Sequence, residues 1–122
     1  YLTRDAPAFA YHYAYGDLSR YARSVEEIAR IVPIARNRWI GAGYRGADGS
    51  RDSASEAMQS DTNGFIVRHD GTLPDLLYRI GEVQGRDIHA ITPETTGATP
   101  LAIACEVNWI WIKGVIELVA GE

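Results

Sequence analysis

The sequence of 122 residues predicts a mixed α+β fold, with an antiparallel sheet of about four to six strands and one principal helix packed on a face. Aromatic and small residues alternate over residues 9–15, and apolar residues alternate again over residues 101–119, as in half-buried strands. Residues 18–32 have the spacing of an amphipathic helix. Length and a hydrophobic content of 46% indicate a single domain, 1–122, whose core needs no disulfide or metal.

The first predicted strand separates aromatic from small side chains. One face carries Phe9, Tyr11, Tyr13 and Tyr15, and the other carries Ala10, His12 and Ala14. Such an aromatic row either packs one face of a sheet or forms a platform on which a planar ligand stacks. The tyrosine hydroxyls need water or polar partners, which the border of a cleft would supply. Tyr11 and Tyr13 are therefore candidate ligand-binding residues.

The helix predicted over residues 18–32 has two start signals. Asp17 can cap its first turn, while Ser24 and Glu27 form a capping box that places a kink or a second start near Ser24. Pro33 disfavours helical backbone at the residue before it, where we expect the helix to end.

The middle of the chain predicts less regular structure. Residues 36–45 contain two glycines and are expected to form a strand with a bulge. Residues 46–64 are nearly all small or polar and predict a long loop, which is either a binding lid or a surface insertion without order. Within that loop, a capping box at residues 53–56 favours a short helix.

Two short strands and a short helix are expected further along the chain. Residues 65–69 have the composition of a strand closed by a turn, and residues 74–80 that of a helix stopped by Gly81. Residues 88–91 predict another strand, and residues 92–100 predict a loop.

The last segment, residues 101–119, alternates apolar side chains and loses its phase near Lys113 and Gly114. We expect two strands joined by a turn, or one long bent strand. At the edge of a sheet this C-terminal strand would pair with another chain, so a strand-mediated oligomer is one open alternative. Cys105, the only cysteine, lies in this run and is expected to be a small buried side chain, and no intrachain disulfide can form.

The charge balance argues against two classes of partner. The formal net charge is −4, which disfavours bulk capture of nucleic acid or of an anionic membrane, and no apolar run is long enough for a membrane span. Arginines dominate the basic residues, either through coding composition or because their forked donors bind carboxylate or phosphate at two points. Four of them lead into the predicted loop: Arg36, Arg38, Arg45 and Arg51. A start at Tyr1 suggests a processed form or a piece of a longer protein, and the compartment is not predicted.

The three histidines do not form a metal-binding pattern. His12, His69 and His89 lack the two- or four-residue spacing of strand or helix metal sites, so we expect no metal and no cofactor. His69 stands beside Asp70 at the end of a predicted strand, where a general base can be held, although a surface turn has the same composition.

One tripeptide carries a family resemblance. Residues 44–46, Tyr-Arg-Gly, resemble the turn of some ADP-ribosyltransferases whose arginine binds the nicotinamide dinucleotide. The resemblance covers three residues and implies ligand-binding roles for Tyr44 and Arg45. Those enzymes also carry a Ser-Thr-Ser strand and an acidic loop that ends in the catalytic glutamate. Neither is identifiable here, where residues 53–56 and Glu106 are weak substitutes.

Two functional hypotheses follow. The first is a small binding or interaction module, of the partner-specific regulatory or immunity type, whose aromatic and arginine-containing surface contacts a protein partner. The alternative is a small transferase or hydrolase, such as a toxin-type ADP-ribosyltransferase-like enzyme, acting on a nucleotide-like or small polar ligand. In that enzyme Arg45 would bind an anion, His69 or Glu106 would act as general acid or base, and Tyr11 and Tyr13 would stack the ligand.

Overall fold

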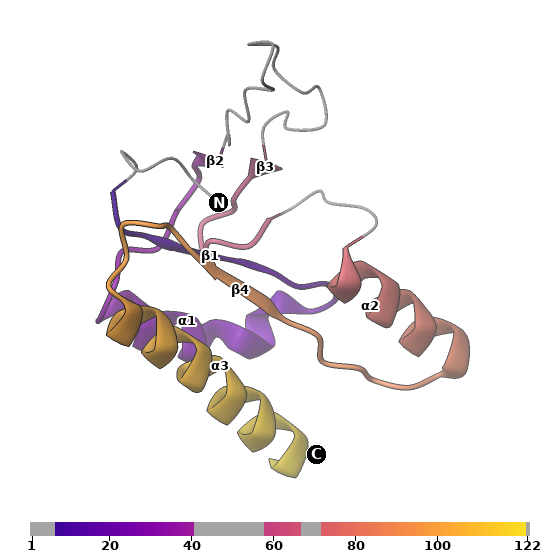
Figure 1. Ribbon diagram of the computed structural model, residues 1–122. Helices are drawn as coiled ribbons and strands as arrows, with labels where there is room; N and C mark the ends of the chain where they lie inside the picture. Colours follow the sequence, from indigo (N-terminus) through magenta and orange to yellow (C-terminus); the bar gives the residue numbers. More distant parts are fainter. Residues whose placement is uncertain (1–6, 41–57, 67–71, 122) are drawn as a thin grey trace.

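A computed structural model describes residues 7–40, 58–66 and 72–121. Its elements are β1 (Ala10–Tyr13), the 3-10 helix η1 (Leu18–Tyr21), α1 (Ala22–Ala29), β2 (Trp39–Ile40), β3 (Met58–Gln59), α2 (Leu73–Gln84), β4 (Thr92–Thr95) and α3 (Leu101–Gly121). The strands form two antiparallel pairs, β1 with β4 and β2 with β3. In Figure 1, α1 and α3 lie on one side of the β1–β4 pair, and β2 and β3 lie on the other.

The fold is α+β, but the prediction of four to six sheet strands with one principal helix is wrong. The described residues form three α-helices and only two-stranded sheets. The main reason is the segment over residues 101–119, which is α3 and not a strand. This helix is apolar on several sides, so its sequence fits a period of two residues as well as the helical period. The predicted C-terminal strand therefore does not exist, and the expectation of an oligomer formed through that strand loses its basis.

Strand β1 lies at the centre of the sheet layer. It pairs antiparallel with β4, with His12 opposite Pro93. On its other edge, the His12 amide donates to the Gly64 carbonyl, and the His12 carbonyl accepts from the Ile66 amide. Both backbone groups of His12 thus point away from β4, so Pro93 can occupy β4 without leaving an acceptor unpaired. The alternation over residues 9–15 predicted this strand correctly.

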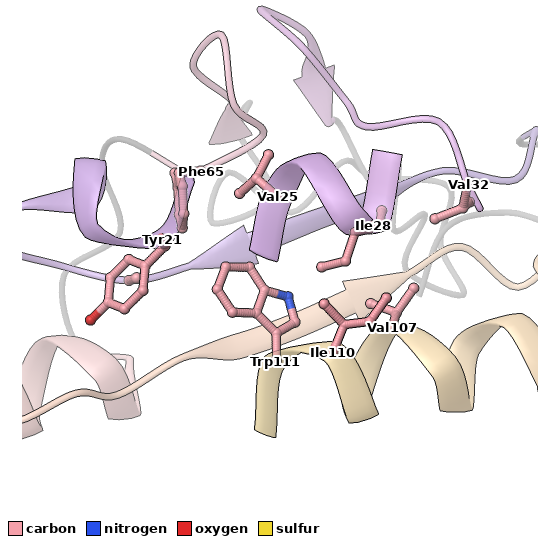
Figure 2. Packing of buried hydrophobic residues seen from close by; sticks show 10 residues of the cluster. Tyr21, Val25, Ile28, Val32, Phe65, Val107, Ile110 and Trp111 are labelled. Atoms are coloured by element: carbon pink, nitrogen blue, oxygen red, sulfur yellow. The ribbon is translucent and has the colours of Figure 1, made fainter. Parts of the chain in front are cut away.

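The two faces of β1 belong to two different cores. Ala10 and Ala14 lie against the helices, in a cluster that includes Val25 and Ile28 of α1 and several residues of α3. Figure 2 shows α1 and α3 meeting through the side chains of Val25, Ile28, Val107, Ile110 and Trp111. The opposite face packs in a second cluster of Phe9, Tyr11, Tyr13, Ala35, Ile40 and Ile66. The helices thus pack on the face that carries Ala10, His12 and Ala14, where the two alanines allow close approach, and not on the aromatic face.

Helices α1 and α3 touch at Gly114. A Cβ built at Gly114 would overlap the hydroxyl of Ser24, which is buried in α1. Gly114, where the predicted strand alternation loses its phase, is therefore a contact point between two helices. Beside it, Lys113 pairs with Glu27 at 3.0 Å, an ion pair that joins the two helices.

The first helical segment starts where predicted but ends earlier. The carboxylate of Asp17 accepts a hydrogen bond from the Ser19 amide, which confirms Asp17 as the cap of η1. The capping box at Ser24 does not form, because α1 begins at Ala22 and Ser24 faces α3. The helix ends at Ala29, since the next residues already turn back toward β1.

The second helix is longer than predicted. Thr72 caps α2, and the helix continues through Gly81 to Gly85, which closes it with a positive φ of 61°. Gly81 is needed for a different reason, because a Cβ there would lie 2.6 Å from the carbonyl oxygen of Arg86. The prediction that Gly81 stops the helix is therefore wrong.

The remaining strand predictions hold only in part. Residues 88–91 are irregular, while residues 92–95, predicted as loop, form β4. Phe65 and Ile66 take part in isolated bridges and not in a strand. The end of the bulged strand, most of the predicted loop with its short helix, and the turn after residues 65–66 lie outside the described residues.

Candidate functional site

Tyr11 and Tyr13 lie together in the second core. Their ring centroids are 6.0 Å apart, and both side chains are buried. Burial, reinforced by the nearby carboxylate of Glu94, raises the pKa of Tyr13 to about 12 and raises that of Tyr11 further. Glu94 stands opposite Tyr11 in β4, and burial raises its own pKa. The two tyrosines are therefore packed in the core beside one carboxylate, and among the described residues they offer no open surface on which a ligand could stack.

The other predicted site residues are not brought to Tyr11 and Tyr13. Glu106 is exposed on α3, which packs on the opposite face of β1. Tyr44, Arg45 and His69 lie outside the described residues.

Two of the four clustered arginines have structural contacts. The guanidinium of Arg38 lies 4.5 Å from the centre of the Phe9 ring. Arg36 donates to the backbone oxygen of Thr62 at 2.7 Å. Arg45 and Arg51 lie outside the described residues.

His12 is a fully buried histidine beneath α3. Its ring centroid lies 4.9 Å from that of Trp111 and 5.2 Å from that of Phe65. Neither ring nitrogen of His12 has a hydrogen-bond partner among the described residues, and the same holds for Nε1 of Trp111. Burial lowers the pKa of His12 to about 3, so the ring is neutral in the folded protein.

His89 belongs to a polar cluster at the end of η1. Its Nδ1 lies 2.9 Å from the Tyr21 hydroxyl, and its Nε2 lies 3.0 Å from the Arg20 guanidinium. Because arginine can only donate, Nε2 accepts this hydrogen bond, which assigns the ring proton to Nδ1. Arg20 also pairs with Asp87 at 2.7 Å. The cluster therefore fixes one tautomer of a histidine that is almost completely buried.

An apolar groove runs from His89 along α3. It has a volume of about 410 Å³. Its walls come from β4 and the residues just before it, and from one side of the helix: His89, Ile91, Pro93, Asn108, Trp111, Ile112, Val115 and Ile116. A mostly apolar hollow with a few polar groups is a usual form of binding site.

The outer face of α3 continues this groove. The side of the helix opposite its buried residues carries a row that we call the α3 stripe: Ala102, Cys105, Trp109, Ile112, Ile116 and Val119. All six are exposed, and the four largest have exposed fractions from 52% to 61%. Their spacing alternates between three and four residues, which is the heptad pattern of helices that pack side by side. Cys105 is thus exposed in this row and not buried as predicted.

Neither a metal cluster nor a membrane span is found in the part of the chain that the structure describes. No group of three or more histidine, cysteine or acidic side chains is placed there to hold a metal ion. None of the described helices combines the length and apolar character required to cross a membrane.

Sequence reasoning missed both the His89 cluster and the α3 stripe. Tyr21 and His89 are 68 residues apart, so no local pattern connects them. The alternation over residues 101–119 predicts a strand and so separates the residues of the stripe. Their three- and four-residue spacing is nevertheless present in the sequence, at Cys105, Trp109, Ile112, Ile116 and Val119. Comparison with known proteins adds no family: no family model, no curated protein and no solved structure matches this chain.

Proposed function

We propose that this protein is an interaction module that binds an α-helix of its partner along the α3 stripe. The observation that carries the proposal is the exposure of large apolar side chains at heptad spacing on the side of α3 that faces away from its own core. A monomeric soluble domain rarely leaves a continuous apolar surface in water unless another molecule covers it.

The spacing identifies the shape of the partner. Side chains three and four residues apart form one seam on a helix, and such a seam packs best against a second helix with the same spacing. Trp109, with 56% of its surface exposed, is the residue type that most often dominates binding energy. Ile112 and Ile116 belong both to the stripe and to the wall of the apolar groove, so a docked helix would also contact the groove.

The surface proposed here differs from the aromatic surface expected from the sequence. Tyr11 and Tyr13 are buried, so they are poor candidates for contact with a partner. The alternative of a small enzyme rests on Arg45 and His69, which lie outside the described residues, and remains a prediction.

A synthetic helical peptide with leucine at every a and d position is a suitable probe of this function. We expect its addition to shift the NMR signals of residues along the α3 stripe, with the largest changes at Trp109, Ile112 and Ile116. The double variant Ile112→Glu/Ile116→Glu should lose this binding, because two charges would be buried in the seam. Val83→Glu is the matched control, since Val83 is 88% exposed on α2.

Two results would contradict the proposal. One is the absence of any peptide-induced shift on α3 in the monomeric protein. The other is binding that survives in the double variant while its thermal unfolding curve matches that of Val83→Glu.

A further inference from the structure

We infer that the helix that covers the α3 stripe is α3 of a second copy of this chain, running antiparallel to the first. The inference depends on the proposed function, because it identifies the partner for the same surface. It rests on the charges beside the stripe, on the sizes of the side chains within it and on the exclusion of α2 as a competing surface.

Charges beside the stripe favour the antiparallel direction. With Trp109 and Ile116 at a positions and Ile112 at d, Glu106 and Lys113 both occupy e positions, seven residues apart. In an antiparallel pair, e positions face e positions, so Glu106 of each copy lies beside Lys113 of the other. Two Glu106–Lys113 ion pairs would therefore form between the copies, related by the twofold symmetry of the dimer.

A parallel pair would gain no such contacts. In that direction e positions face g positions, and the g positions of α3 carry Leu101, Asn108 and Val115. Antiparallel helix dipoles also attract each other, whereas parallel ones repel.

The position of Lys113 suits this role. Its side chain is 37% exposed and is held by Glu27 at 3.0 Å, at the edge where the second helix would lie. Glu106 is exposed and has no ion-pair partner among the described residues. In the dimer, Glu106 of the second copy would join Lys113 and Glu27 in a three-residue network.

The side chains along the stripe also complement each other in the antiparallel direction. With the helices centred between Ile110 and Trp111, Ala102 meets Val119, Cys105 meets Ile116, and Trp109 meets Ile112 of the other copy. Each smaller residue faces a larger one, which is how side chains fill a seam without voids.

Helix α2 carries a similar row but does not fit itself. Leu73, Leu76, Ile80 and Val83 are exposed at heptad spacing. In an antiparallel pair of α2 helices, Arg79 would stand beside Arg79 of the other copy. Each Arg79 is already paired with Asp75 of its own helix at 2.7 Å, so this arrangement adds no ion pair between the copies. This surface therefore provides a control for the substitutions in α3.

A membrane surface fits the stripe less well than a second copy does. Helices that lie in a membrane interface usually carry many lysines and arginines beside their apolar face. The flank of α3 carries Glu106, Lys113 and Glu117, so acidic residues outnumber basic ones, and the whole chain has a formal net charge of −4.

Analytical ultracentrifugation of the full chain over a wide concentration range tests the dimer directly. We expect a reversible monomer–dimer equilibrium, weakened by at least ~100-fold in Ile112→Glu/Ile116→Glu and unchanged in Val83→Glu. A protein that stays monomeric at every concentration and still binds the leucine peptide on α3 would overturn the second copy and leave the proposed function standing. A dimer unaffected by the double substitution would also overturn the inference.

A charge exchange tests the direction and the pairing. Glu106→Lys alone and Lys113→Glu alone should each weaken self-association, by roughly fivefold, because each places like charges in contact. An equimolar mixture of the two variants should restore association, since every contact between them is again of opposite charge. Circular dichroism melting of each variant separates this effect from loss of the Lys113–Glu27 pair. A mixture no stronger than its components would contradict the antiparallel arrangement.

The single cysteine offers an independent check. Parallel helices would place Cys105 against Cys105, and mild oxidation of the native chain would then give a covalent dimer. In the antiparallel arrangement, the native chain gives none, whereas Ile116→Cys does, through Cys105 of one copy and position 116 of the other. Rapid crosslinking of the native chain would overturn the inference. So would a monomer that binds phosphatidylcholine–phosphatidylglycerol vesicles through the stripe.

Discussion

Gly114 of α3 lies so close to Ser24 of α1 that a methyl group at position 114 would overlap the serine hydroxyl. At this contact the distance between α1 and α3 is short because glycine has no side chain. The dimer proposed above depends on this contact indirectly. Because Gly114 faces α1, the opposite side of α3, which carries the α3 stripe, faces the solvent.

Gly114→Ala should destabilise the protein, although alanine is the better helix former by about 1 kcal/mol. Overpacking against Ser24 costs more than this gain, and we expect a net loss of about 1–2 kcal/mol in the free energy of unfolding. Ser24→Ala in the same chain should recover most of the loss by removing the overlapping hydroxyl. Gly121→Ala is the control, since a Cβ there would meet nothing within 4 Å apart from its chain neighbours and the backbone of its own helix. Equal effects at positions 114 and 121 in urea denaturation would refute the contact.

His12 should make the protein sensitive to acid. Burial lowers its pKa to about 3, whereas an unfolded histidine has a pKa near 6.5. Between these values the unfolded chain binds the proton and the folded chain does not, so stability falls as the pH falls, by up to about 1.4 kcal/mol per pH unit.

His12→Leu should flatten this dependence below pH ~6.5 and should not reduce stability at neutral pH, because it removes two buried nitrogens without partners. Chemical denaturation of both proteins at a series of pH values measures the difference. Parallel stability curves for the two would show that His12 is not the titrating group.

His89 should exist as the tautomer with its proton on Nδ1. Long-range nitrogen–proton NMR correlations report this directly, and Tyr21→Phe should leave the tautomer unchanged because Arg20 fixes it through Nε2. In Arg20→Leu the carboxylate of Asp87 stays 3.9 Å from Nε2, and the proton should move to Nε2 to meet it. A native chain with the proton already on Nε2 would disprove the hydrogen-bond assignment.

Tyr13 should ionise far above the usual pH for tyrosine. Burial and the charge of Glu94 raise its pKa to about 12, so the unfolded chain loses this proton first and stability falls as the pH rises above ~10. Glu94→Gln should lower the pKa of Tyr13 without returning it to the ordinary value, because burial is the larger cause. Spectrophotometric titration with Tyr13→Phe as reference measures this shift. A titration identical in Glu94→Gln and the native chain would exclude the contribution of Glu94.

The sequence predicted those parts of the fold that depend on neighbouring residues. Strict alternation around Tyr11 and Tyr13 indicated β1, and Asp17 indicated the start of η1. Helix α3 was missed because one side packs in the core while the opposite side is also apolar, which removes the polar face that usually identifies a helix. In the sequence, the exposed apolar side of α3 has the same residue types as a buried side. Tyr21 and His89 are far apart in the chain, so their contact could be found only from the three-dimensional structure.

Pro93 has one more effect, which concerns aggregation. The backbone of His12, which stands opposite Pro93, hydrogen-bonds to Gly64 and Ile66 on the side of β1 away from β4. The backbone of Pro93 therefore points to the edge of β4 that faces away from β1. There it presents a carbonyl but no N–H group, so a foreign strand that approached this edge would meet a missing donor in mid-strand. The proline thereby discourages amyloid-like stacking in a chain that exposes rows of large apolar side chains on α2 and α3.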